Sequence, residues 1–434
     1  MLKRIVIGAG SLGLACLLVF LALGWRPVIA PIDPPDRTGF PTDLIAKGEV
    51  LAGAGYCAVC HTRPGGPALA GGTGLRTPFG TIYSTNITPE PETGIGRWSL
   101  EAFARAMREG VSRDGSHLFP AFPYDHFAKI SDDDVKALYA YMMTRPPVRA
   151  VAPANTIPFP LNIRLLQEGW KILFFREGRY QPDASRSAEW NRGAYLAESL
   201  GHCSGCHTPR NSLGAEKTAD AYAGATIDNW IAPALTDANP SPVPWTETEL
   251  YSFLRNGVAP LHGVTAGPMS PVIHTGLSAL PDADVRALAV YFAGLDRAAS
   301  RTGAVDAAVK DALARSGLGS TQEYDPDARL YAGACMGCHY NAGPTPLAVR
   351  PELALNSALA LPEPTNFINV VLSGIGRAEG GPGLVMPSYA AALSDGDIAR
   401  LAAYLRRTCT DKPPWTDIEK KVAVARAQRT PNRD

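Results

Sequence analysis

Two cysteines separated by two residues and followed directly by a histidine occur three times in this chain of 434 residues. A C-x-x-C-H sequence is the attachment site of a c-type haem. Each thiol adds to one vinyl group of the haem, and the histidine binds the iron as its proximal ligand. We therefore predict three covalently bound haem c groups. The predicted attachment cysteines and proximal histidines are Cys57, Cys60, His61, Cys203, Cys206, His207, Cys335, Cys338 and His339.

The remaining cysteines argue against other uses of these motifs. Only Cys16 and Cys409 lie outside them, so two spare cysteines cannot supply the second pair of ligands that a zinc site would need at each of three motifs. A thioredoxin-like site would need a βαβ pattern around the motif, and none is visible. A disulfide framework is not indicated, because Cys16 lies in the apolar N-terminal segment and Cys409 near the other end.

Length and composition indicate a large globular chain with no net charge. At 434 residues the chain fits about three domains of ordinary size. Hydrophobic residues make up 46% and charged residues 19%, so each part can bury a core. The net charge is zero, which gives no support for binding to nucleic acid. Partners are expected to be other proteins or small redox carriers.

Residues 1–30 are predicted to form a membrane anchor. Lys3 and Arg4 precede an apolar run from Ile5 to Trp25, which is long enough to cross most of a bilayer. The basic residues hold the N-terminus in the cytoplasm, so the bulk of the chain is exported. The alternative is a signal peptide cleaved after Val28-Ile29-Ala30. We favour an uncleaved single-pass anchor in the bacterial inner membrane, with the haem domains facing the periplasm.

The rest of the chain repeats one pattern three times. Each copy has a short helix before the motif, a middle helix whose apolar residues lead to a glycine, and a closing helix with apolar residues three and four apart. This is the order of elements in a class I cytochrome c domain. We predict an all-α fold of three tandem class I cytochrome c domains behind an N-terminal transmembrane helix. The predicted segments are a proline-rich stalk at 31–41 that lifts the first domain off the membrane, domains at 42–146, 187–298 and 323–410, linkers at 147–186 and 299–322, and a polar tail at 411–434.

A low-spin haem that carries electrons needs a sixth ligand, and methionine in the distal loop is the expected one. Met269 and Met386 lie in the loops before the second and third closing helices. In the first copy, Phe122 stands where the others have methionine, and phenylalanine cannot bind iron. Two histidines lie nearby, and we predict His126 as the ligand, with His117 as the second choice. Bis-histidine coordination would give this haem a lower potential than the other two; the alternative is a five-coordinate iron.

The chain resembles the membrane-bound triheme cytochrome c subunits of bacterial periplasmic dehydrogenases. The resemblance covers nearly the whole chain. It is carried by Thr77-Pro-Phe-Gly-Thr-Ile-Tyr-Ser-Thr-Asn-Ile-Thr-Pro89, by Glu92-Thr-Gly-Ile-Gly96 and by Gly115-Ser-His-Leu-Phe-Pro-Ala-Phe-Pro-Tyr124. The catalytic subunits of such dehydrogenases are quinoproteins, flavoproteins or molybdenum hydroxylases of the nicotinate and isoquinoline type. Many members have methionine at the position of Phe122, and the stretch Phe122-Pro-Tyr-Asp-His126 resembles the molybdenum-hydroxylase branch more.

The resemblance implies an electron-transfer subunit with no catalytic residues of its own. A partner catalytic subunit would oxidise the substrate, and the haems would pass the electrons to ubiquinone, a terminal oxidase or another cytochrome. The sequence agrees, because no acid–base pair or nucleophile stands out beyond the haem ligands. The alternative is a haem enzyme, peroxidase-like, that works at an open first haem.

Overall fold

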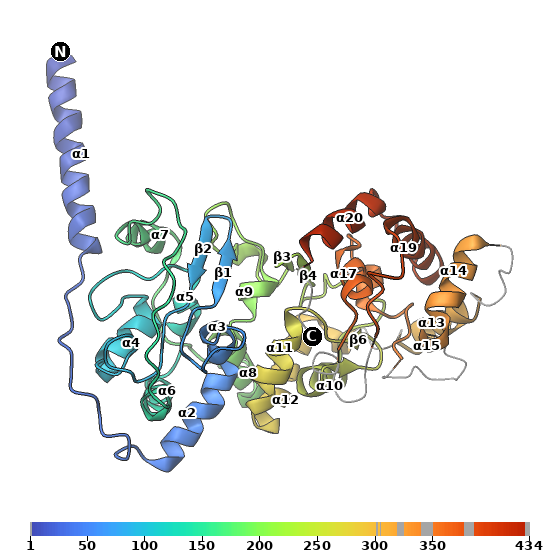
Figure 1. The fold of residues 1–434 in the computed structure, drawn as a ribbon, viewed down its shortest axis with the longest axis horizontal. Coiled ribbons are helices and arrows are strands. Elements are labelled where there is room, and N and C mark those ends of the chain that lie inside the picture. Colours follow the sequence, from blue (N-terminus) through green and yellow to red (C-terminus); the bar gives the residue numbers. More distant parts are fainter. Residues whose placement is uncertain are drawn as a thin grey trace. The chain divides into compact units, whose positions relative to one another are not determined.

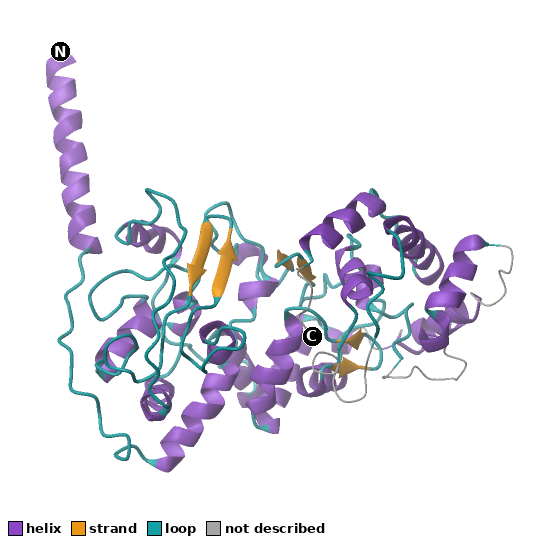
Figure 2. Cartoon of the chain, viewed as in Figure 1, coloured by secondary structure: helices purple, strands orange, loops and turns teal. Residues whose placement is uncertain are grey.

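The computed structural model describes residues 2–300, 303, 305–318, 325–339, 350–376 and 386–429. Contacts divide the chain into two compact units, Met1–Pro182 with Glu198–His202, and Asp183–Ala197 with Cys203–Asp434. Helices dominate both units (Figure 1, Figure 2). The strands that the structure describes form three two-stranded antiparallel hairpins. The predicted all-α class is therefore correct in its helices, and the small hairpins are an addition to it.

The first unit carries the first haem motif on a short helix between two longer ones. The motif helix α3 follows α2 directly, and the hairpin β1–β2 forms the loop beyond it, with Gly74 opposite Tyr83. The elements of this unit are α1 (Leu2–Gly24), α2 (Thr42–Ala54), α3 (Cys57–His61), β1 (Gly74–Thr77), β2 (Gly80–Tyr83), α4 (Leu100–Glu109), α5 (Tyr124–Phe127), α6 (Asp132–Thr144) and α7 (Leu166–Phe174).

The second unit contains the other two motifs. Its first half comprises α8 (Ala188–Glu198), α9 (Ser204–His207), β3 (Ala225–Ile227), β4 (Trp230–Ala232), α10 (Glu247–Asn256), β5 (Val258–Ala259), β6 (Gly263–Val264), α11 (Met269–Pro271), η2 (Val272–Gly276) and α12 (Asp282–Leu295). Its second half comprises α13 (Val305–Leu318), α14 (Pro326–Ala334), α15 (Met336–His339), α16 (Ser357–Ala360), α17 (Thr365–Ser373), α19 (Asp395–Cys409) and α20 (Ile418–Gln428).

The order of helices predicted for each copy is present around all three motifs. A first helix, a motif turn, a middle helix and a closing helix follow one another as α2–α3–α4–α6, α8–α9–α10–α12 and α14–α15–α17–α19. Side-chain caps begin several of them: Ser131 accepts from the amide of Asp134, and Ser394 forms a capping box with Asp397. The middle helix α4 ends at Gly110, whose φ of 60° suits glycine.

In the first two copies, the first and closing helices cross at very short range. A Cβ on Gly48 would lie 2.0 Å from the carbonyl oxygen of Ala137, and a Cβ on Gly193 would lie 2.0 Å from that of Ala287. Glycine is needed at both crossings because any side chain would push the helices apart. An ion pair also joins the two helices in each copy. These pairs are Lys47–Asp134, Arg192–Asp284 and Asp327–Arg400, each with a shortest N–O distance of 2.7 Å.

Two segments expected to be a linker and a tail contribute to the core instead. Helix α13 lies in the segment 299–322 and buries Ala312 in the same cluster as Leu401. Helix α20 lies in the expected polar tail, and its Val422 is fully buried against Ile398. The sequences of both helices are rich in polar residues and alanine. Their short apolar faces therefore give only a weak sequence signal for burial in a core. Residues 430–434 lie outside the described part.

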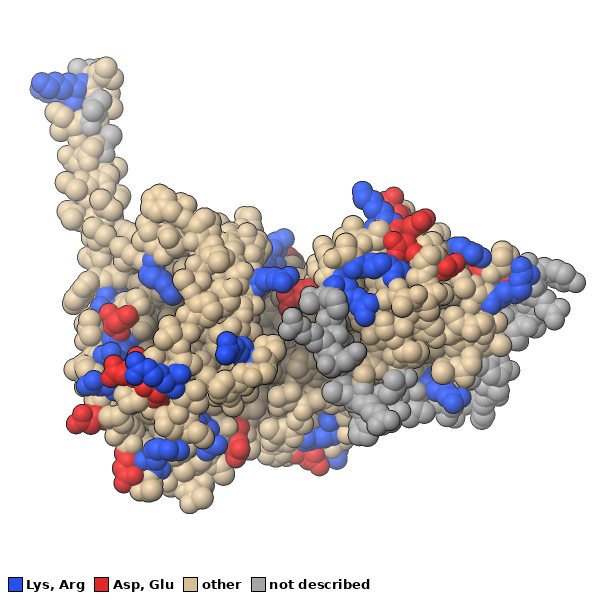
Figure 3. All heavy atoms as spheres, in the orientation of Figure 1, with Lys and Arg blue, Asp and Glu red and all other residues tan. Residues whose placement is uncertain are grey.

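Helix α1 is the one described helix that is long and apolar enough to cross a membrane. Figure 3 shows it free of acidic side chains, with blue basic ones at its outer end. The chain after it does not stand off from the first unit as a stalk would. The Ile29 amide donates a hydrogen bond to the Arg113 carbonyl (2.9 Å), and the Ile32 amide donates one to the Arg97 carbonyl (3.0 Å). These backbone hydrogen bonds hold the segment along the first unit.

Candidate haem-binding sites

The first motif occupies a single helical turn, α3. Tyr56 enters it with a left-handed φ of 64°, and the turn then places Cys57 and Cys60 on one side with His61 at its end. Burial raises the pKa of Cys57 to about 12 and also raises that of Cys60. Both thiols are partly buried. Cysteine spacing and enclosure together fit covalent haem attachment.

Each of the three motif histidines makes the same kind of hydrogen bond, from its ring to a backbone carbonyl. The ring Nδ1 of His61 lies 2.6 Å from the carbonyl oxygen of Thr85, that of His207 lies 2.7 Å from Pro233, and that of His339 lies 3.4 Å from Pro351. A carbonyl can only accept, so Nδ1 carries the proton and Nε2 keeps the lone pair that binds a metal. Contacts of this kind orient metal-bound histidines. Burial lowers the pKa of all three rings, which keeps them neutral.

A second repeated contact closes the loop after the motif. The hydroxyl of Thr62 accepts from the amide of Leu69 (3.0 Å), and the hydroxyl of Thr208 accepts from the amide of Tyr222 (2.9 Å). These contacts and the carbonyl acceptors were not found from the sequence. Backbone carbonyls carry no residue-type signal, although a threonine directly after two of the motifs could have pointed to the loop.

In the second copy, the loop that carries the predicted distal methionine packs against the strand β4, which leads to the carbonyl acceptor of His207. Met269 begins the short helix α11 and is partly buried. Gly267, two residues before it, packs against the Trp230 indole of β4, where a Cβ would lie 2.4 Å from the ring. Pro233, the acceptor of His207, comes three residues after that tryptophan. The distal loop and the proximal loop are therefore packed against each other.

In the third copy, the predicted distal methionine, Met386, is held by backbone pairing. Met386 and Ile375 exchange both of their amide-to-carbonyl hydrogen bonds, at 2.9 and 3.0 Å. The hydroxyl of Tyr389 donates to the carbonyl of Ala334, the residue before the third motif. The loop that carries Met386 is thus anchored next to Cys335. This arrangement fits a distal ligand, and residues 377–385 of the same loop lie outside the described part.

In the first copy, Phe122, which stands where the other copies have methionine, makes an aromatic contact. Its ring lies 5.3 Å from that of Phe127, and it packs against the same core as Cys57. The predicted ligand His126 is buried, and its Nδ1 lies 3.1 Å from the carbonyl oxygen of Glu198. This is the contact that the motif histidines make, and it assigns the Nδ1 proton in the same way. Its ring centroid lies 6.3 Å from that of His202.

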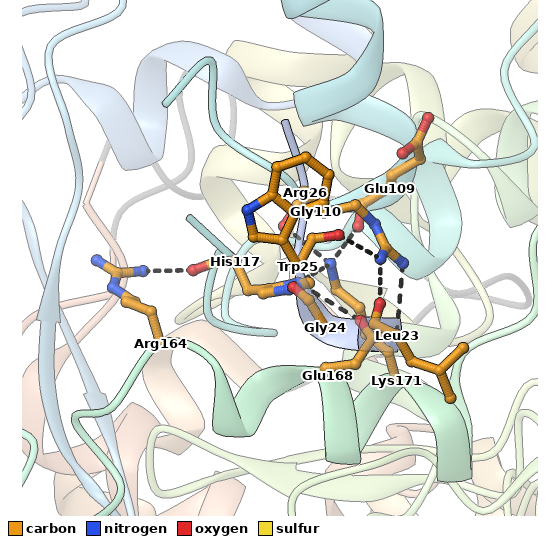
Figure 4. Close-up of polar contacts among 10 residues, drawn as sticks. All are labelled: Leu23, Gly24, Trp25, Arg26, Glu109, Gly110, His117, Arg164, Glu168 and Lys171. Atoms are coloured by element: carbon orange, nitrogen blue, oxygen red, sulfur yellow. Dashed lines mark hydrogen bonds and ion pairs between the residues drawn. The ribbon is translucent and has the colours of Figure 1, made fainter. Parts of the chain in front are cut away.

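The second-choice ligand, His117, is committed to other partners (Figure 4). Its Nε2 lies 2.7 Å from the carbonyl oxygen of Gly24 at the end of α1, and Lys171 Nζ lies 3.0 Å from its Nδ1. A lysine ammonium can only donate, so Nδ1 accepts and the Nε2 proton goes to Gly24. Binding iron would cost His117 one of these contacts. His126, which also has hydrogen-bond partners of its own, stays the predicted ligand of the first haem.

Comparisons with known proteins place these sites in two cytochrome families. The family described as "Cytochrome c" matches residues 45–146, and the family described as "Cytochrome C oxidase, cbb3-type, subunit III" matches residues 322–405. These ranges contain the first and the third motif.

Similar proteins are redox subunits. A protein of Pseudomonas putida that is named as a subunit of nicotinate dehydrogenase is 48% identical over 96% of the chain, which spans only 35% of that relative's length. The fructose dehydrogenase cytochrome subunit of Gluconobacter japonicus is 36% identical over 89% of the chain and 83% of the relative. The gluconate 2-dehydrogenase cytochrome c subunit of Pantoea cypripedii is 37% identical over 89% of the chain and 90% of the relative. The chain belongs to this family, the haem-binding cytochrome c subunits of dehydrogenases.

Proposed function

We propose that the chain binds three haem c groups and carries electrons from the catalytic subunit of a dehydrogenase to an acceptor at the membrane. The single observation that carries this is the Nδ1-to-carbonyl contact made by His61, His207 and His339. It prepares each Nε2 for iron next to a pair of enclosed cysteines. Bound haem would supply one-electron redox chemistry, and the protein would set its potential through the axial ligands and burial.

We propose the axial partners from the loops described above. Met269 and Met386 would complete the second and third sites, and His126 would complete the first. A thioether raises the potential of a haem relative to a second imidazole. The first haem would therefore have the lowest potential of the three, which suits a different place in the electron path.

We infer that the catalytic partner is a molybdenum hydroxylase. The relative with 48% identity is named as a subunit of nicotinate dehydrogenase, whereas the relatives named for fructose and gluconate dehydrogenases show 36–37% identity. Quinoprotein and flavoprotein partners remain the second possibility. The acceptor would be ubiquinone, a terminal oxidase or another cytochrome, reached from the periplasmic face of the inner membrane to which α1 anchors the chain.

An uncleaved anchor is supported by the way that the chain leaves α1. The Gly24 carbonyl accepts from His117, and Arg105 donates to the carbonyl of Pro27 at 2.6 Å. Cleavage after Ala30 would remove both contacts and the hydrogen bond of Ile29. The peroxidase-like alternative is not favoured, because the relatives are named as cytochrome subunits.

The haem count tests the central proposal. Haem is released as its pyridine complex from the purified protein and compared with the protein concentration. We expect three haems per chain, and two in each variant in which one pair of motif cysteines is replaced by alanine. A value of two in the unaltered protein would contradict the proposal. Electron transfer is tested on the complex isolated with its catalytic subunit, in which nicotinate should reduce the haems whereas fructose or gluconate should not.

A further inference from the structure

Helix α7 shows its apolar side to the outside and its charged side to the protein. Glu168 and Lys171 are 6% exposed, whereas Ile172 is 48% and Leu173 is 60% exposed. A surface helix of a soluble domain has the opposite arrangement, with its apolar residues facing the core. Water is therefore not the natural environment of the outer side of α7.

Buried ion pairs and hydrogen bonds fix this orientation. Lys171 Nζ donates to the carbonyls of Glu109 and Gly110, where α4 ends, and contacts His117 (Figure 4). Glu168 pairs with Arg26 at 3.3 Å and lies 3.6 Å from His117. Turning the helix to bury its apolar side would separate these buried charges from their partners, at a large cost in free energy. The orientation is consequently a stable feature of the first unit.

Exposed apolar side chains gather around this helix. Outside α1, the structure describes eleven large hydrophobic residues with high exposure, and eight of them lie in the segments 25–28 and 159–173. Random scatter would not place most of them there, and exposed apolar residues that gather in one region mark an interaction site. Figure 3 shows few charged side chains over the region of α7. The members of this patch, called the α7 face, are Trp25, Val28, Phe159, Leu161, Ile163, Leu166, Ile172 and Leu173.

The α7 face begins where the candidate membrane helix ends. The last turn of α1 rests on α7: a Cβ on Gly24 would lie 2.5 Å from Leu165, and one on Gly169 would lie 3.7 Å from Phe20. Helix α1 has 23 residues and would be about 35 Å long, enough to cross a bilayer. If α1 spans the membrane, the α7 face lies at the level where the chain leaves it.

We propose that the α7 face lies in the interfacial layer of the bilayer that α1 spans, so that the first unit is held against the lipid by two elements. The occupant is lipid rather than protein because the face is continuous with α1. Trp25 suits that depth, since tryptophan collects at membrane interfaces. Apolar side chains on one side of a helix bind there through the area that they bury. The inference rests on the anchoring of α1 in the proposed function.

Photolabelling by lipid tests this with the unaltered full-length protein. The protein is reconstituted in phosphatidylethanolamine–phosphatidylglycerol vesicles that contain a phospholipid with a diazirine near its headgroup. After irradiation, labelled peptides are mapped by mass spectrometry. We expect label in α1 and in residues 159–173, and several-fold less at Leu213 and Val424, which have similar exposure. In the variant Ile172→Asp/Leu173→Asp, label should be lost from 159–173 and kept in α1, with the haem spectrum unchanged.

Each other result has a distinct meaning. Label in α1 with none in 159–173 would overturn the α7 proposal and leave the anchor intact. Absence of label from α1 as well would refute the anchor itself. A third result would be that residues 159–173 stay unlabelled in vesicles but are protected from hydrogen exchange in the complex with the catalytic subunit. Protein would then cover the α7 face, and the proposal would also be overturned.

Discussion

The ring of each motif histidine is oriented by a backbone carbonyl from a loop that follows the motif. Thr85, Pro233 and Pro351 lie 24, 26 and 12 residues after their histidines. A side-chain acceptor would titrate or rotate, whereas a carbonyl fixed in a loop does neither. This contact holds the imidazole in one tautomer over the whole working pH range. It also makes the loop, and not only the motif, part of each site.

His126→Ala tests the sixth ligand of the first haem. If His126 binds that iron, the variant should bind carbon monoxide at one haem in three when reduced, because the coordination position is open. The electron paramagnetic resonance signal of bis-histidine iron should disappear as well. His274→Ala is the matched control, since it lies in the corresponding loop of the second copy. A variant whose carbon monoxide binding equals that of the unaltered protein would rule out this ligand.

Phe122→Met tests the interpretation of the missing methionine. The side chains have similar volumes, so the core around Phe127 should tolerate the change at a cost below about 1.5 kcal/mol. A thioether in the distal loop should compete with His126 and raise the lowest of the three midpoint potentials. Potentiometric titration followed in the visible spectrum measures this shift. An unchanged titration, with the variant folded and holding its haems, would show that this position does not face the iron.

At the scale of elements, the glycines at the helix crossings carry the strongest prediction. Gly193→Ala would place a Cβ 2.0 Å from the carbonyl oxygen of Ala287. The helices must separate, and overpacking of this kind costs about 1–3 kcal/mol. Gly333→Ala is the control, because nothing lies within 4 Å of its Cβ position in α14. Alanine there should stabilise the helix by up to about 1 kcal/mol.

Thermal unfolding followed by circular dichroism distinguishes the two variants. The midpoint should fall for Gly193→Ala and should rise slightly or stay constant for Gly333→Ala. Equal midpoints would mean that the first and closing helices of the second copy can separate without cost.

Lys171 gives the first unit a pH dependence on the alkaline side. Burial lowers the pKa of Lys171 from 10.5 to about 8. The unfolded chain then holds this proton more tightly than the folded one, so the contribution of Lys171 to folding stability increases between pH 8 and 10.5. In Lys171→Met this contribution is absent. As the pH rises across that window, the unfolding midpoint of the unaltered protein should increase relative to that of Lys171→Met. The variant Lys136→Met, on the exposed side of α6, should follow the unaltered protein.

The helices differ in how strongly their sequences predict them. The motif turns and the closing helices were predicted because covalent chemistry and capping residues mark them in the sequence. Helices α13 and α20 were not predicted as core elements, because each buries only a narrow face that polar residues interrupt. The stretch Trp170-Lys-Ile-Leu-Phe-Phe175 is apolar except for its lysine. Whether it faces protein or lipid depends on where Glu168 and Lys171 find partners, which is a tertiary property.

At the scale of the whole molecule, the anchor and the α7 face make separable contributions to membrane binding. Replacing residues 2–19 by a cleavable signal peptide should leave the haem motifs and their loops unchanged, so we expect three haems per chain in the soluble product. That product should still bind phosphatidylethanolamine–phosphatidylglycerol vesicles, weakly and with little sensitivity to salt, because apolar burial rather than charge drives the contact. Adding Ile172→Asp/Leu173→Asp should abolish the remaining binding. Sedimentation of vesicles with the haem-coloured protein measures both steps, and a soluble product that never sediments would mean that α1 alone holds the chain at the membrane.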